Sequence, residues 1–151
     1  MSAFRKSIAV FCAAAILLGI PLLPVCRAEE KIFCVYCLNA AEEAALARFC
    51  AAAAEGEPFA CRLAVAAAML NRLADPRFPD TVSGILAAAG FSAPKRTQKA
   101  YNEALWAVRA AAMGADPTGG AVLWARSDTA AAARIDETFC AGNLVFGRAA
   151  R

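Results

Sequence analysis

Apolar residues recur at intervals of three and four positions in four stretches of the chain, a spacing typical of helices with one buried face. In the first stretch the apolar side is formed by Leu38, Ala41, Ala45, Leu46 and Phe49. The spacing predicts four helices, over residues 39–54, 58–73, 82–89 and 97–113.

Turn and capping residues stand at the ends of these helices. Gly56 suits the position after the first helix, and Pro58 suits the first turn of the second. Asp80 or Thr81 is expected to cap the third helix and Thr97 the fourth, because their side-chain oxygens accept hydrogen bonds from the free N–H groups of a first turn.

The last third of the chain has a different pattern. Residues 116–120 read DPTGG, a dense run of turn formers. Short strands are predicted after it, over residues 121–126 and 144–146. Helices followed by short strands predict a single α+β domain, predominantly helical, with a small late β-sheet or hairpin.

Alanine dominates the helical stretches, and it favours helix while burying little apolar area. The core is therefore expected to depend on a few large side chains among closely packed helices. These are Phe49, Phe59, Leu63, Met69, Leu70, Leu105, Trp106 and Trp124.

The first 28 residues have the layout of a secretory leader. Arg5 and Lys6 precede an apolar run over 7–25, and Ala28 offers a small residue for cleavage. We expect a signal peptide over residues 1–28 and an exported domain over 29–151, in the periplasm, the cell envelope or outside the cell. Two alternatives stay open: an uncleaved membrane anchor, or a lipoprotein acylated at Cys26. We expect contact with a membrane only through such a leader.

The charge of the chain gives no indication of nucleic-acid binding. Of the 16 basic residues, Arg5, Lys6 and Arg27 lie in the leader, so the remaining 13 balance the 13 acidic residues. A basic face is the usual electrostatic mark of a nucleic-acid-binding protein. We therefore expect no nucleic-acid partner.

Cysteine and histidine usage narrows the possible chemistry. Five of the seven cysteines lie beyond the leader, which suits an oxidising compartment, and the chain has no histidine. The Cys34–Cys37 pair has redox spacing, but a structural disulfide or an unordered segment fits it better than a thiol-exchange site. A zinc site lacks a second such pair. We expect no metal and no cofactor, and any catalysis would depend on carboxylates, hydroxyls or thiols.

One long segment carries a family resemblance. Residues 47–72 read ARFCAAAAEGEPFACRLAVAAAMLNR, similar to the SleB/CwlJ cell-wall hydrolase signature Y-x-E-A-R-G-E-P-x-x-G-Q-x-A-V-A-x-V-x-L-N-R. Four shorter blocks follow in the family's order: DPRFPDTVSGIL at 75–86, GFS at 90–92, DPTGGAV at 116–122 and GNLVF at 142–146. The resemblance implies a fold related to lysozyme and lytic transglycosylases, and peptidoglycan glycan strands as the substrate. It spans about a hundred residues.

The sequence departs from this pattern at positions tied to the chemistry. Glycan cleavage needs a carboxylic acid that protonates the departing oxygen. Aligning the shared Gly-Glu-Pro places the family's main catalytic glutamate at Ala53. Cys61 and Arg62 replace a glycine and a glutamine, and Leu144 and Arg148 stand where histidine or tyrosine is common. This pattern suggests an altered or lost activity.

Glu57 is the remaining candidate for an acid or base. It would share the face of Ala53 only if the helix continued through Gly56 and Pro58. The alternative is a helix-start acid that stabilises the second helix through its dipole. Glu55 would point away from the same pocket.

The resemblance also suggests where substrate would bind. Phe91, Trp124 and Asn143 are candidate glycan contacts, with core packing as the alternative for Trp124. Cys61 and Cys140 are a possible disulfide. The leading hypothesis is therefore a peptidoglycan hydrolase or lytic transglycosylase, and the alternative is a non-catalytic relative that binds peptidoglycan or a cell-wall protein.

Overall fold

The computed structural model describes residues 35–91 and 97–149. In order along the chain its elements are α2 (Ala40–Ala53), α3 (Phe59–Ala74), α4 (Val82–Ala88), α5 (Gln98–Ala112), β1 (Leu123–Arg126), the short 3-10 helix η1 (Ala132–Arg134), β2 (Ile135–Ala141) and β3 (Leu144–Ala149). The leader, Cys34 and Ser92 lie outside the described residues. The α+β class, predominantly helical with a small late sheet, is confirmed.

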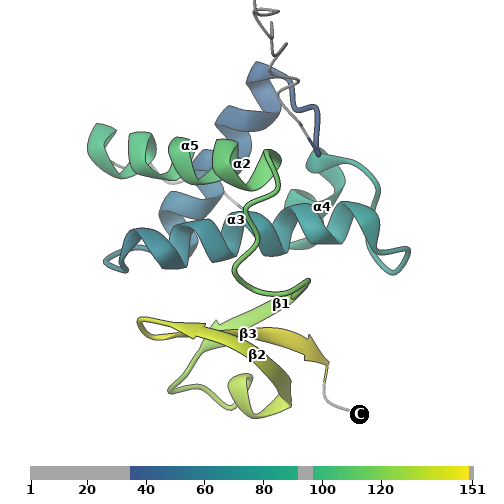
Figure 1. The fold of residues 1–151 in the computed structure, drawn as a ribbon, viewed down its shortest axis with the longest axis vertical. Coiled ribbons are helices and arrows are strands. Elements are labelled where there is room, and N and C mark those ends of the chain that lie inside the picture. The colour runs from purple at the N-terminus through teal and green to yellow at the C-terminus, as the bar shows by residue number, and fades with distance from the viewer. Residues whose placement is uncertain (1–34, 92–96, 150–151) are drawn as a thin grey trace, which may run out of the picture. The chain divides into compact units, whose positions relative to one another are not determined.

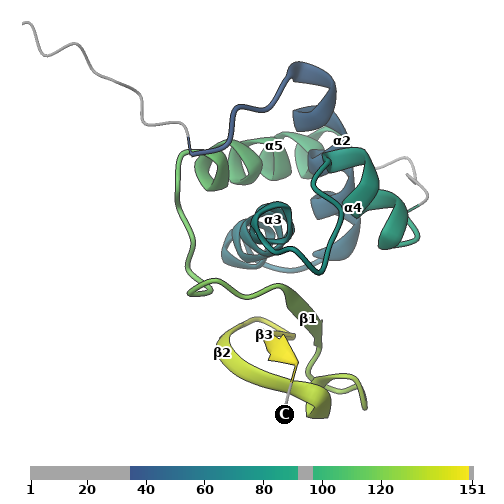
Figure 2. The ribbon, with the colours of Figure 1, turned by 90° about the vertical axis from the view of Figure 1, so that its right-hand side faces the viewer.

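Helix α3 is the central element of the domain. It contacts α2, α4 and α5 on one side and strands β1 and β3 on the other. Figures 1 and 2 show the sheet beneath α3, with α2 and α5 above it. Nine residues of α3 are buried as a result. None of the helices in the described ranges has the length and apolar character needed to span a membrane.

The helix ends follow the capping chemistry of the sequence. Asn39 caps α2 and forms a reciprocal capping box with Glu42. Thr81 and Thr97 accept hydrogen bonds from the first turns of α4 and α5, as predicted. Pro58 does not occupy the first helical turn: with ψ at 164° it is the extended residue before α3.

The three strands form an antiparallel sheet in the order β1-β3-β2. β1 and β3 were expected, with shorter bounds for β3, whereas β2 was not predicted. Its sequence, IDETFCA, lacks regular alternation, and a register shift between Glu137 and Phe139 interrupts its pairing with β3. The period-two signal that marks most strands is therefore absent from β2.

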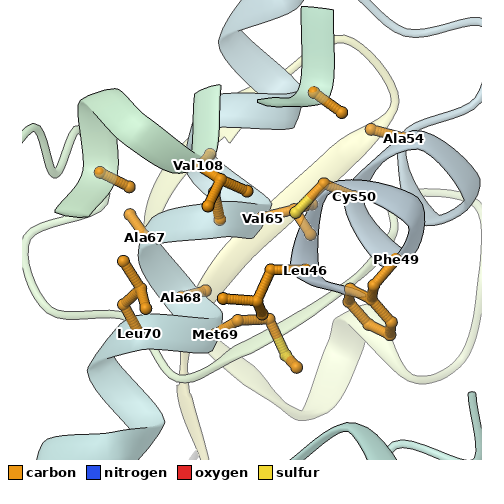
Figure 3. Close-up of a cluster of buried hydrophobic side chains, with 14 of the residues drawn as sticks. Leu46, Phe49, Cys50, Ala54, Val65, Ala67, Ala68, Met69, Leu70 and Val108 are labelled. Carbon is orange, nitrogen blue, oxygen red and sulfur yellow. The ribbon is translucent and has the colours of Figure 1, made fainter. Parts of the chain in front are cut away.

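The hydrophobic core is built from alanine-rich helix faces around a few large side chains (Figure 3). Phe49, Met69 and Leu70 are buried, as predicted. The expectation is wrong for Phe59 and Trp106, which are 45% and 67% exposed. Trp106 lies two positions from both Ala104 and Val108, about 200° around the helix from the buried face.

Trp106 instead lines an open groove. With Leu38 and Met113 it forms part of a cavity of about 510 Å³ between α5 and the segment before α2. Of the large apolar side chains that were predicted to be buried, Trp106 therefore lines this groove and does not enter the core.

Two methionines allow the core to be tested. Met69 is fully buried and Met113 is 55% exposed. We expect Met69→Ala to lower the free energy of unfolding by about 2–5 kcal/mol, because it leaves a cavity. Met113→Ala should change it by no more than about 0.5 kcal/mol. Urea denaturation measures both, and equal losses would contradict the described core.

Candidate functional site

Glu57 lies in the short loop that joins α2 to α3, and it is 8% exposed. Its backbone N–H donates to the carbonyl of Ala54 at 3.3 Å, which closes a tight turn. Among the described residues it is the only acidic residue that is fully buried. A buried charge needs partners, and those of Glu57 come from the far end of the chain.

The carboxylate of Glu57 is bound by Asn143, in the turn between β2 and β3. The backbone N–H of Asn143 donates to Oε2 at 3.1 Å, and its side-chain amide donates to Oε1 at 3.2 Å. Both carboxylate oxygens therefore accept hydrogen bonds from one residue. The contact joins the helical part of the domain to its sheet.

Gly142 makes this contact possible. Its φ is +51°, and a side chain there would collide with Oε2 of Glu57. It would also press on Cys61 and Pro58, at 3.1 and 3.2 Å. Only glycine combines this backbone conformation with so close an approach.

Two further side chains surround the carboxylate. Arg126 on β1 places Nη1 3.9 Å from Oε1, at the outer limit of an ion pair. The thiol of Cys61 lies 4.0 Å from Oε2 and donates to the carbonyl of Ala141 at 3.0 Å. Burial, and then the charge of Glu57, raise the pKa of the Cys61 thiol, while Arg62 opposes the shift. A raised pKa disfavours the nucleophilic thiolate.

The expected Cys61–Cys140 disulfide is not formed in the structure, where both are free thiols. Cys61 points to the carbonyl of Ala141, whereas Cys140 is exposed on β2. Because neighbouring strand residues face opposite sides, Cys140 points away from the face that Ala141 and Phe139 turn toward the core.

The aromatic candidates are engaged in internal contacts. Phe91 and Trp124 pack edge-on against Phe49, with ring centroids 5.0 and 5.8 Å away. The guanidinium of Arg72 lies 4.6 Å from the ring centre of Trp124 and 5.0 Å from that of Phe78. The cation therefore occupies one face of Trp124. Sugar stacking by Phe91 and Trp124 stays a prediction.

The DPTGG turn is held by Asp116. Its carboxylate accepts hydrogen bonds from Thr118, from the N–H of Gly120 and from the amide of Asn71. Burial favours a higher pKa for Asp116, but these hydrogen bonds hold the pKa below its usual value. Asn71 and Arg72 also donate to the carbonyls of Ala121 and Val122, which fixes the start of β1 against α3.

A search of the described residues for clustered histidine, cysteine and acidic side chains finds no group that could hold a metal ion.

The comparison with known families decides the relationship. The cell wall hydrolase family model matches residues 56–146, which is more than half of the chain. The chain belongs to the cell wall hydrolase family. The matched range includes Glu57 and Asn143, and it begins three residues after Ala53.

Curated relatives and solved structures agree with this family assignment. The chain is 42% identical over 81 residues to spore cortex-lytic enzymes of Halalkalibacterium halodurans and Oceanobacillus iheyensis, covering 51% of this chain but only 24% and 29% of those proteins. The catalytic domain of the germination-specific lytic transglycosylase SleB from Bacillus anthracis superposes with a TM-score of 0.60 at 28% identity, covering 73% of this chain and 96% of that domain. The Bacillus cereus SleB catalytic domain gives 0.57 at 29% identity, covering 75% and 94%.

The sequence comparison with the family signature predicts that the position of the catalytic acid corresponds to Ala53. Ala53 is the last residue of α2, half-buried against the core. The helix does not continue beyond it, so Glu57 does not share its face through helical spacing. Glu57 is instead directed to Asn143 by the loop.

Arg62, which replaces the family's glutamine, supports the same loop. Its Nη1 donates to the carbonyl oxygen of Glu57 at 2.8 Å and lies 3.3 Å from a carboxylate oxygen of Glu103 on α5. The sequence marked Arg62 only as a departure from the family pattern, and Arg126 was not recognised as part of this site. No local signal marks them as part of it, because their partners are set by the packing of the chain.

The contribution of the contact between Glu57 and Asn143 to the free energy of unfolding can be measured. We expect Glu57→Ala to lower the free energy of unfolding by about 1–3 kcal/mol, because it removes the charged acceptor of two hydrogen bonds from Asn143. Glu137→Ala, at an exposed glutamate of β2, is the control and should cost no more than about 0.5 kcal/mol. If urea denaturation gives the two variants equal stability, Glu57 has no structural role.

Proposed function

We propose that this chain is an exported, peptidoglycan-directed domain that binds the glycan strand without cleaving it. Family membership and the SleB catalytic-domain neighbours support peptidoglycan as the target. The leader over residues 1–28 supports a location in the cell envelope or beyond. The chain spans only about a quarter to a third of the curated relatives it matches, so their activity is carried over as part of this proposal.

The proposal rests on the residue that stands at the position of the family's catalytic acid. Cleavage of a glycosidic bond needs a group that delivers a proton to the leaving oxygen. Ala53 has no proton to give, and both oxygens of Glu57 accept hydrogen bonds from Asn143. Glu57 is thus positioned as an acceptor that holds the turn.

The scaffold, by contrast, keeps the family's structural motifs. Asp116 still orders the DPTGG turn, and Arg72 still joins α3 to the start of β1. These contacts preserve the arrangement of helices and sheet. A fold that is retained without the catalytic acid favours binding of the glycan strand over its hydrolysis.

One observation favours a second candidate, in which Glu57 is the catalytic acid of a hydrolase or lytic transglycosylase. It lies within the family motif, is shielded from solvent, and has Arg126 and the Cys61 thiol beside it. Shielded carboxyl groups are the usual acids of such reactions. This candidate requires Glu57 to leave Asn143 when the substrate binds.

Turnover of purified peptidoglycan separates the two candidates. We expect no soluble fragments from the native protein or from Glu57→Gln, and fragments from Ala53→Glu, because that change restores a carboxyl group at the acid position. Release by the native protein that disappears in Glu57→Gln would establish the second candidate. Inactivity of Ala53→Glu would show that more than the acid has been lost.

Binding is tested by co-sedimentation with the same insoluble peptidoglycan. We expect the native protein to sediment with it, because it binds the glycan strand without releasing soluble fragments. A native protein that stays in the supernatant would contradict the proposed function itself.

A further inference from the structure

A second hollow lies at the opposite end of α3 from Glu57. It has a volume of about 510 Å³ and opens between the end of α3, the turn that follows it, the segment before β1, and β3. Its polar lining comes from Asn71, Asp75, Arg77 and Arg148, with the backbone of Gly120 on one side. Nothing in the Glu57 site uses these residues.

Arg148 is the central cation of this hollow. It follows Leu144 and Phe146 at two-residue steps along β3, so its side chain leaves the strand on the face that packs on the helices. Unlike those two buried residues, Arg148 is exposed. No carboxylate among the described residues lies within ion-pair distance of it.

Gly120 provides the space for this guanidinium. A Cβ atom at position 120 would lie 3.2 Å from Nη2 of Arg148, and the φ of Gly120 is +85°. The N–H of Gly120 is bound by Asp116. The ordered turn therefore forms a wall on which the guanidinium of Arg148 rests.

Arg148 is the arginine of this hollow whose charge is not neutralised by an ion pair with a neighbouring carboxylate in the described part of the chain. Arg77 is held by Asp75 in a two-pronged ion pair, with Nε–Oδ1 at 2.9 Å and Nη2–Oδ2 at 2.6 Å. This pair, with a smaller effect from Arg148, lowers the pKa of Asp75 to about 2, so its carboxylate is charged at neutral pH. Asp136, opposite Arg148 on β2, is the other nearby acid, and it forms no ion pair with it.

We propose that this hollow binds a free carboxylate of the peptidoglycan stem peptide, with Arg148 as the residue that recognises it. A guanidinium presents paired N–H donors that match the two oxygens of a carboxylate. Arg77 remains paired with Asp75, and the side-chain amide of Asn71 donates to Asp116 and to the carbonyl of Ala121, so recognition rests on Arg148.

The position of the hollow suits a peptide attached to a bound glycan. At about 3.3 Å per strand residue, Arg148 lies roughly 16 Å along β3 from Asn143. A stem peptide extends away from the sugar to which it is attached, so its carboxylates can reach a subsite at this distance. The inference therefore rests on the proposed function and adds a peptide subsite to it.

Calorimetric binding of three purified probes tests the subsite. The probes are a peptidoglycan disaccharide tripeptide with free carboxylates, the same compound with its carboxylates amidated, and the disaccharide without a peptide. We expect the native protein to bind the free-carboxylate probe about tenfold more tightly than the amidated one. Arg148→Gln should abolish that preference, Arg148→Lys should keep part of it, and Arg134→Gln, at an exposed arginine of η1, should keep all of it.

The outcomes separate this inference from the proposed function. Equal affinity of the native protein for the free and amidated probes overturns the carboxylate subsite, as does an Arg148→Gln variant that still prefers the free-carboxylate probe. Binding of the disaccharide in either case upholds the proposed glycan-binding function. Binding of the free-carboxylate probe through Arg148, without any affinity for the disaccharide, upholds the subsite and overturns glycan binding. Absence of binding to every probe overturns both.

Discussion

The hydrogen bonds between the carboxylate of Glu57 and Asn143 are the constraint on which the site depends. They connect the loop before α3 to the turn between β2 and β3, two segments 86 residues apart. Because Glu57 is buried, losing these donors would leave a charge without compensation in a place that water reaches poorly. Gly142 is explained by the same contact, since a side chain at this position would collide with the carboxylate.

This contact also bears on the proposal that the chain binds the glycan strand without cleaving it. In this chain both oxygens of the Glu57 carboxyl group accept hydrogen bonds from Asn143, which ties this group to the turn between β2 and β3. Under the proposed function, the fold that this chain shares with the cell wall hydrolase family binds the glycan strand, and alanine at position 53 leaves it without a proton donor. On the same proposal, the hollow around Arg148 adds recognition of the attached stem peptide.

The sequence predicts much of the helical part and little of the site. Repeated apolar spacing and the caps Thr81 and Thr97 are local signals, and the helices begin and end close to the expected residues. Strand β2 and the exposure of Trp106 were missed because an irregular strand lacks a pattern and a large apolar residue need not face the core. The docking of Glu57 on Asn143 could not be predicted, because long-range pairing is determined only when the whole domain packs.

Hydrogen exchange at the amide of Asn143 tests the central claim most directly. If Glu57 holds this turn, the amide of Asn143 is protected in the native protein and loses that protection in Glu57→Ala, while the amides of the α3 core keep theirs. NMR-detected exchange measures both sets in one sample. An Asn143 amide that exchanges at the same rate with and without Glu57 would contradict the account.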